Sequence, residues 1–213
     1  MKGLFIVLEG VEGAGKSTQA RLLARWMDEL GVPHTLAREP GGTPVGEAIR
    51  QVVLDKGSLT MPPETELFLI LGARAAFVRE VVRPALEAGE VFLADRFDFS
   101  SFAYQGYGRG LELSEVRSAN LLATGGLQPD LYLVLDLPVE EGLDRKAGGG
   151  DGDRIEREGP PFLARVREGY RALALEEDRA QLVSAEGSPE QVQERIRRVL
   201  VERFPETFAV DRV

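Results

Sequence analysis

The first residues that could do chemistry form a glycine-rich segment ending in lysine and serine. Residues 10–17 read Gly-Val-Glu-Gly-Ala-Gly-Lys-Ser, which matches the phosphate-loop pattern G-x-x-x-x-G-K-S. Glycines let backbone N–H groups converge on phosphate oxygens, and the start of a helix adds a favourable dipole. Lys16 would then reach the β- and γ-phosphates of a nucleoside triphosphate, and the Ser17 hydroxyl would coordinate Mg²⁺. The segment predicts nucleotide binding for phosphoryl transfer.

Other nucleotide-binding classes fit this segment less well. A dinucleotide-binding fingerprint would have a third glycine where Ser17 and Thr18 stand. A GTPase switch would carry an Asn/Thr-Lys-x-Asp reader of guanine, and no lysine of this chain follows asparagine or threonine. A motor or transporter ATPase would normally be longer and carry partner-binding regions. A kinase for a small acceptor fits a chain of 213 residues.

Several arginines occur where a second phosphate could bind. An acceptor that carries phosphate needs a positive pocket opposite the phosphate loop, and a planar guanidinium binds phosphate with two hydrogen bonds. The candidates are Arg38 and Arg50, Arg74 in a largely apolar stretch, and Arg96 directly after Asp95. The alternatives are a surface arginine at position 74 and a simple ion pair at 95–96.

Alternating apolar runs and amphipathic stretches must position these residues. The pattern favours an α/β fold with a doubly wound parallel sheet, whose ligands lie at the carboxyl ends of the strands. We expect one domain over residues 1–213, with a glycine-rich loop at 148–153. Strands are predicted at 4–8, 34–38, 91–94, 131–135 and 181–183, and helices at 16–30, 44–54, 63–88, 138–146, 161–179 and 189–204.

The composition limits the partners of this chain. A net charge of −9 argues against a nucleic-acid-binding surface, so an acidic ligand must meet a local positive pocket. The absence of cysteine excludes disulfides, zinc–thiolate sites and thiol catalysis. The apolar run at residues 1–9 is too short for a signal peptide or a membrane span. We therefore expect a cytoplasmic protein with no membrane contact.

Four segments, taken in order, resemble the bacterial type of thymidylate kinase over nearly the whole chain. The segments are 10–18, Arg-Glu-Pro-Gly-Gly-Thr at 38–43, residues 95–106 with Ser-Ser-Phe-Ala-Tyr-Gln-Gly, and Asp-Arg-Ile-Glu at 153–156. The resemblance implies a P-loop nucleoside-monophosphate-kinase-like fold, with five parallel strands flanked by helices. It also implies that ATP and dTMP give ADP and dTDP for dTTP biosynthesis, with Mg²⁺ as cofactor and a homodimer as the assembly.

The resemblance assigns roles to individual residues on the acceptor side. It places Arg96 and Arg50 on the dTMP phosphate, Arg74 on thymine O4 and Ser101 at the pyrimidine edge, and it makes Tyr104 crowd the sugar C2′. The implied dTMP-binding set is Glu12, Arg50, Ile70, Arg74, Asp95, Arg96, Ser101, Tyr104 and Gln105.

The resemblance also assigns the donor side and the catalytic groups. Arg145 would flank the adenine beside the turn at 184–187, and Ser17 and Asp95 would hold the metal. Arg154 would close over the transferring phosphoryl from a lid at about 146–158, so Lys16, Arg96 and Arg154 are the implied catalytic residues. The implied ATP-binding set is Gly10, Glu12, Gly13, Ala14, Gly15, Lys16, Ser17, Thr18 and Arg145.

Two departures from the family leave alternatives open. Family members usually place an aromatic residue four positions before the thymine-reading arginine, where this chain has Ile70. Either another aromatic residue replaces it or thymine binds more weakly, and selectivity between dTMP and dUMP does not follow from the sequence. The lid also has few basic residues.

Two other functions compete with this interpretation. One is a kinase for another nucleotide or a small hydroxyl substrate, and the other is a nucleotide-dependent switch protein.

Overall fold

A computed structural model describes residues 3–55, 59–146 and 154–209. Its centre is a parallel sheet of five strands in the order β2-β3-β1-β4-β5, so the doubly wound fold is confirmed. The central strand is covered on both faces, which explains its continuous apolar run. The strands are β1 (Leu4–Gly10), β2 (His34–Arg38), β3 (Val91–Asp95), β4 (Leu131–Asp136) and β5 (Ala180–Ser184).

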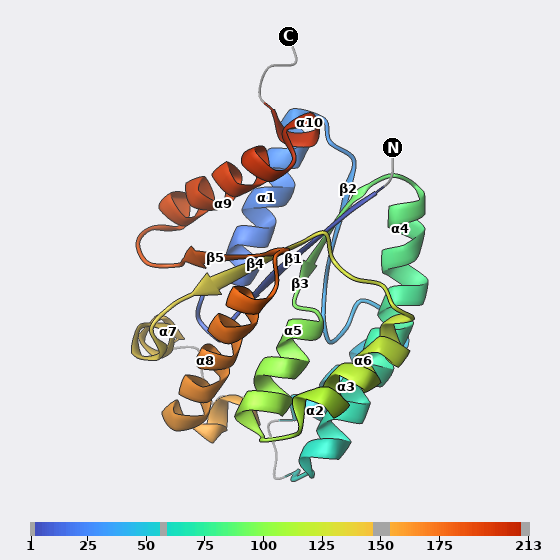
Figure 1. The fold of residues 1–213 in the computed structure, drawn as a ribbon, viewed down its shortest axis with the longest axis vertical. Coiled ribbons are helices and arrows are strands. Elements are labelled where there is room, and N and C mark those ends of the chain that lie inside the picture. The colour runs from blue at the N-terminus through green and yellow to red at the C-terminus, as the bar shows by residue number, and fades with distance from the viewer. Residues whose placement is uncertain (1–2, 56–58, 147–153, 210–213) are drawn as a thin grey trace.

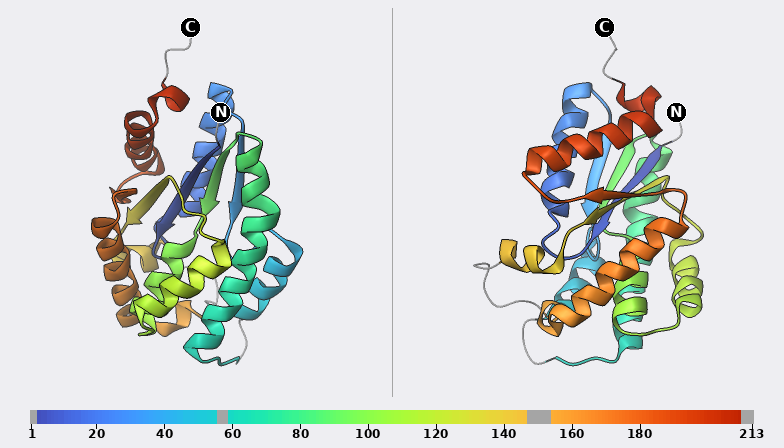
Figure 2. Two further views of the ribbon diagram at one scale, coloured as in Figure 1. Left: turned by 45° about the vertical axis from the view of Figure 1, so that its right-hand side comes forward. Right: turned by 60° about the vertical axis from the view of Figure 1, so that its left-hand side comes forward.

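Helices cover both faces of this sheet, which gives three layers (Figure 1). On one face lie α1 (Lys16–Leu30) and α9 (Pro189–Arg203), followed by the short α10 (Pro205–Phe208). On the other face lie α5 (Asp98–Ser101) and α8 (Pro160–Glu176), as the two rotated views in Figure 2 show. The loops after β1 and β3 leave the same edge of the sheet, where the phosphate loop meets Asp95.

The long helix predicted over 63–88 is divided by a π-helical turn. It consists of α3 (Pro63–Phe77), the π turn η1 (Val78–Val82) and α4 (Arg83–Glu87). Pro84 has no N–H and its ring crowds the carbonyl four residues earlier. The chain therefore widens at this point, and the Arg83 N–H donates to the carbonyl of Val78 instead.

Helices between β3 and β4 form a wall beside the site, and the sequence patterns did not predict them. A second π segment, η2 (Phe102–Gly108), continues α5, and α6 (Leu113–Thr124) packs beside α3 together with the predicted α2 (Pro44–Val53). The predicted helix before the lid is α7 (Val139–Lys146), and η3 (Glu156–Glu158) precedes α8. The predicted loop at 148–153 lies outside the described residues, so the lid is described only at its two ends.

Candidate active site

The phosphate loop lies between β1 and α1, as its sequence predicts. Its shape depends on glycine at two positions in particular. Gly13 has φ 77°, and a Cβ there would lie 2.2 Å from the carbonyl oxygen of Gly142. Gly15 precedes α1 with φ 85°, a left-handed conformation that other residues rarely adopt. These glycines give the backbone N–H groups at the start of α1 free approach to a phosphate.

Lys16 is held inside the loop by its own backbone. Its Nζ donates to the carbonyl of Val11 at 2.8 Å, and the residue is only 7% exposed. Burial, assisted by the positive charge of Arg96, lowers the pKa of the Lys16 ammonium to about 8. The negative charge of bound phosphates would stabilise the protonated ammonium of Lys16.

The predicted metal ligands lie within hydrogen-bond distance of each other. The Ser17 hydroxyl donates to Asp95 Oδ2 at 2.5 Å, because β3 is the direct neighbour of β1 and ends at the same sheet edge. A hydroxyl and a carboxylate are oxygen ligands of the kind that Mg²⁺ prefers. Within the described ranges, no group of three or more Asp, Glu or His side chains could enclose an ion by itself. The donor set therefore fits an ion that is also held by phosphate oxygens.

The phosphate loop lines one side of an open pocket, which we call the donor pocket. Arg145 lies at one end of it, where its Nη2 donates to Glu141 at 2.6 Å and to the carbonyl of Ala185 at 3.1 Å. Pro189 and Val192, which were not predicted from the sequence, add apolar surface from the start of α9. The other lining residues are Glu12, Gly13, Ala14, Gly15, Lys16, Ser17, Thr18, Gln19, Arg38, Glu39, Arg50, Asp95, Arg96 and Gly187.

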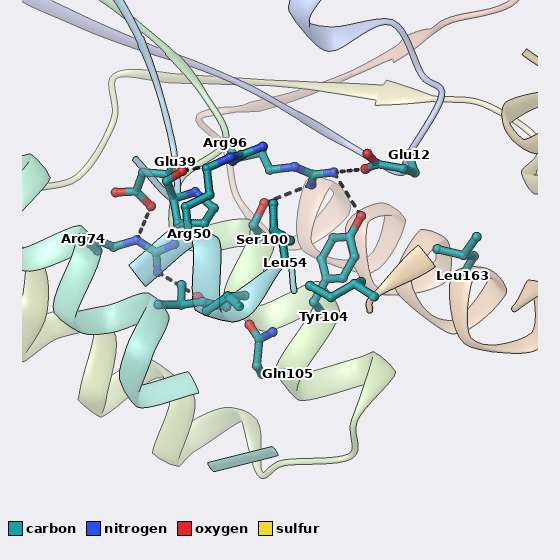
Figure 3. A pocket seen from close by; sticks show the side chains of 15 residues that line it. Glu12, Glu39, Arg50, Leu54, Arg74, Arg96, Ser100, Tyr104, Gln105 and Leu163 are labelled. Carbon is teal, nitrogen blue, oxygen red and sulfur yellow. Dashed lines mark hydrogen bonds and ion pairs between the residues drawn. The ribbon is translucent and has the colours of Figure 1, made fainter. Parts of the chain in front are cut away.

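A second pocket, the acceptor pocket, adjoins the first (Figure 3). The two share Glu12, Glu39, Arg50 and Arg96, so their common wall carries two arginines. Every member of the predicted dTMP-binding set lines the acceptor pocket except Asp95, which lines the donor pocket. Its other lining residues are Pro40, Val53, Leu54, Ile70, Arg74, Ser100, Ser101, Tyr104, Gln105, Ile155 and Leu163.

Arg96 is fixed in the common wall by several hydrogen bonds. Its Nη2 donates to Glu12 Oε2 at 2.7 Å and to the Tyr104 hydroxyl at 3.0 Å. Its Nη1 donates to Ser100 Oγ at 3.2 Å and to the Tyr170 hydroxyl at 2.9 Å. The residue has φ 77°, a strained backbone conformation for a non-glycine residue. Such strain is found where the surrounding structure fixes a functional side chain.

A buried carboxylate that the sequence did not predict supports Arg96. Glu9 is the penultimate residue of β1, is fully buried, and accepts from Ser100 Oγ at 2.7 Å and the Tyr170 hydroxyl at 2.9 Å. Burial raises the pKa of Glu9, and the charge of Arg96 opposes that rise. The available signal was an acidic residue at the end of an otherwise apolar strand.

Arg74 occupies the opposite end of the acceptor pocket. It is 1% exposed, which excludes the surface alternative. Its Nε donates to Glu39 Oε2 at 2.7 Å, its Nη1 to Asn120 and to Ser101 Oγ, and its Nη2 to the carbonyl of Phe97 at 2.9 Å. One hydrogen on Nη2 has no acceptor among the described residues. Burial raises the pKa of the Glu39 carboxyl to about 7 although the Arg74 charge lowers it.

The aromatic residue expected above a bound base is absent from the described lining. Ile70 lines the pocket, and Tyr104 is the one aromatic residue among the described lining residues. Phe68 is 67% exposed and lies off the pocket. Because the hydroxyl of Tyr104 is bonded to Arg96, this ring lies beside the common wall and not at the Arg74 end of the pocket.

Arg154 lies on the acceptor side and does not line the donor pocket. Its Nε donates to the carbonyl of Val53 at 3.1 Å, and its Nη2 donates to the buried carboxylate of Glu66. Ile155, the next residue, lines the acceptor pocket. The structure thus brings the predicted arginines 50, 74 and 96 together in the lining of the acceptor pocket, whereas Arg154 lines neither pocket.

Comparison with known proteins identifies the family. The family model for thymidylate kinase matches residues 8–196. A thymidylate kinase from Desulforudis audaxviator is 53% identical over 82% of this chain and 79% of its own length. One from Symbiobacterium thermophilum is 47% identical over 96% of both chains. The crystal structure of thymidylate kinase from Ehrlichia chaffeensis superposes with a TM-score of 0.78 at 27% identity, covering 94% of this chain and 100% of the other. This chain belongs to the thymidylate kinase family.

Proposed function

We propose that this protein transfers the γ-phosphoryl group of ATP to dTMP, giving ADP and dTDP for dTTP synthesis. The observation that carries the proposal is the pair Arg50 and Arg96 in the wall shared by the donor and acceptor pockets. An acceptor phosphate bound there would face the γ-phosphate above Lys16. Its oxygen attacks the γ-phosphorus as the bond to the β-phosphate oxygen breaks. The attacking oxygen is already anionic, so no general base is needed.

On the donor side, the loop residues from Gly10 to Thr18 bind the phosphates, and Arg145 flanks the adenine. Lys16 neutralises charge on the β- and γ-phosphates. Ser17 and Asp95 would hold Mg²⁺, which would offset the negative charge that develops on the phosphates during transfer. The 2.5 Å contact between these two side chains supports this assignment.

On the acceptor side, two groups match the edge of thymine. The remaining hydrogen on Arg74 Nη2 donates to O4. Gln105 donates its Nε2 to Glu66 at 2.7 Å, and its buried Oε1, unpartnered among the described residues, accepts from N3–H. Cytosine presents an amino group and an unprotonated N3, so both contacts fail. Ser101 lies beside O4, Glu12 approaches the sugar, and Tyr104 crowds C2′.

Arg154 supplies positive charge to the transferring phosphoryl. Its hydrogen bonds to Glu66 and Val53 hold it on the acceptor side, so this role requires Arg154 to leave those partners. Such an arginine typically contributes a factor of 10³–10⁵ in kcat.

The protein acts as a cytoplasmic homodimer without nucleic-acid partners. Apolar side chains are exposed on the helical wall of α2, α3 and α6, which supports a contact there: Val45, Val52, Phe68, Leu121 and Leu122. In the part of the chain that the structure describes, no helix is long and apolar enough to cross a membrane.

The test is a coupled assay of ADP formation with a panel of monophosphates. We expect dTMP to give the highest kcat/KM, above dUMP, dCMP and UMP. Preference for another nucleotide would overturn the substrate assignment. ADP release that is slow and independent of any acceptor would favour a nucleotide-dependent switch instead.

A further inference from the structure

Glu66, near the start of α3, is a buried carboxylate outside the pocket lining. It is 1% exposed and accepts hydrogen bonds from three side chains. Gln105 Nε2 donates to its Oε1 at 2.7 Å, Arg109 Nη2 donates to its Oε2 at 3.0 Å, and Arg154 donates to the same oxygen. Burial alone would raise the pKa of Glu66, but hydrogen bonds from Arg109 and Gln105, with the charges of Arg109 and Arg154, outweigh it and lower the pKa. Glu66 is therefore ionised at neutral pH.

An ionised carboxylate can only accept hydrogen bonds, and this determines how the Gln105 amide is turned. The NH₂ group must face Glu66, so the carbonyl oxygen faces the other way. Figure 3 shows the Gln105 amide rising from η2 with its oxygen toward the other side chains of the acceptor pocket. That oxygen is buried and has no hydrogen-bond partner among the described residues. A buried acceptor in this position is aimed at a ligand donor.

We propose that Glu66 is a positioning residue: it fixes the amide of Gln105 with the oxygen toward the base, and so selects pyrimidines that carry a hydrogen on N3. The inference rests on the proposed function, because it takes the base to lie against Gln105. Turning the amide by 180° would suit cytosine, whose N3 accepts a hydrogen bond. Glu66 opposes that rotation, because two acceptors would then face each other and the bond from Nε2 would be lost.

The sequence gives no direct sign of this relationship. Glu66 and Gln105 are separated by 39 positions, on α3 and η2, and the packing of these elements brings them together. Arg109 and Arg154 compensate the charge that burial would otherwise disfavour. The arginines thus keep Glu66 ionised, and Glu66 keeps the amide in one orientation.

The test is Glu66→Gln, measured as the ratio of kcat/KM for dTMP to that for dCMP. A glutamine at position 66 can donate or accept, so it no longer dictates the orientation of Gln105. We expect the ratio to fall by about tenfold, the effect of roughly one hydrogen bond. Because Glu66 also holds Arg154, kcat can change for both substrates, but that change cancels in the ratio. Thermal unfolding and binding of an ATP analogue verify the fold of each variant.

Two further variants separate positioning from packing. Glu66→Asp keeps an acceptor-only group and should retain the wild-type ratio even if stability falls. Arg109→Lys keeps a positive charge beside Glu66 and leaves the group that faces Gln105 unchanged, so it should also retain the wild-type ratio. Two results would overturn the proposal. One is a ratio that falls as far in Glu66→Asp as in Glu66→Gln, and the other is an unchanged ratio in Glu66→Gln.

A double-mutant cycle completes the design. If Glu66 acts through Gln105, then Gln105→Ala should lower the ratio, and adding Glu66→Gln should lower it no further. If adding Glu66→Gln to Gln105→Ala lowered the ratio by as much as Glu66→Gln does alone, the proposal would be contradicted. A wild-type enzyme with no preference for dTMP over dCMP would instead refute the proposed base recognition itself.

Discussion

The guanidinium of Arg154 and the carboxylate of Glu66 form an ion pair whose two side chains are 12% and 1% exposed. Arg154 also donates to the backbone of Val53 at the end of α2, so it ties the turn before η3 to the wall of the acceptor pocket. The same carboxylate binds Gln105, which lines that pocket. The residue proposed to stabilise the transferring phosphoryl and the residue proposed to recognise thymine therefore share one anchor.

Replacing Arg154 with alanine is expected to lower kcat by on the order of 10³, as for other charge-stabilising arginines in phosphoryl transfer. KM for dTMP should stay near its wild-type value, because Arg154 does not line the pocket itself. Steady-state kinetics with both substrates measure kcat and KM, and the control is Arg198→Ala, at an exposed position of α9. An unchanged kcat would remove Arg154 from the catalytic set.

Replacing Ile70 with phenylalanine is expected to strengthen dTMP binding. Stacking of a base on an aromatic ring contributes about 1–3 kcal/mol, so KM for dTMP should fall by roughly fivefold or more. Ile70→Ala should raise KM, because it removes apolar surface from the pocket. If both substitutions leave KM unchanged, the base does not lie against position 70.

Tyr104→Leu is expected to weaken the rejection of ribonucleotides. The ratio of kcat/KM for ribothymidine monophosphate to that for dTMP should rise by about tenfold, because the ring no longer fills the space at C2′. Tyr104→Phe is the matched control: it keeps the ring and removes only the hydroxyl that accepts from Arg96. A similar rise in Tyr104→Phe would assign the effect to the position of Arg96 instead.

Binding of ATP is expected to weaken above pH 8. The free enzyme releases the Lys16 proton around this pH, since burial lowers its pKa to about 8, whereas bound phosphates keep Lys16 charged. Binding therefore takes up a proton at higher pH, and the affinity falls as pH rises, by up to about tenfold per unit. Calorimetry with a non-hydrolysable ATP analogue between pH 7 and 9.5 measures both the proton uptake and the fall in affinity. Lys16→Arg should bind more weakly but lack this decline, because arginine stays charged.

Phe68→Glu is expected to convert a dimer into a monomer. Phe68 is 67% exposed on α3, and a charge there would be buried without a partner in a contact along the helical wall. Light scattering of the purified protein gives the mass. The control is Leu175→Glu: Leu175 is an apolar residue of α8, away from that wall, and is 85% exposed. This variant should stay dimeric. A wild-type monomer would refute the proposed assembly.

The sequence alone determined the local features of this protein. The phosphate loop could be predicted because its chemistry resides in eight consecutive residues between a strand and a helix. The five strands could be predicted because a buried parallel strand is a short continuous apolar run. The helices at 98–108 and 113–124 were missed, since polar residues such as Asn120 and Gln105 occupy buried positions there and obscure the apolar period.

Tertiary structure decided which distant residues meet. Glu9, Glu39 and Glu66 were not predicted, because each acts through a side chain of another element: Glu9 through Tyr170, Glu39 through Arg74 and Glu66 through Gln105. A carboxylate in a sequence looks the same whether it will be solvated or buried; only packing determines its partner and its pKa. The sequence therefore predicted the groups that we propose contact phosphate, while the fold determined the buried carboxylates that hold neighbouring side chains in place.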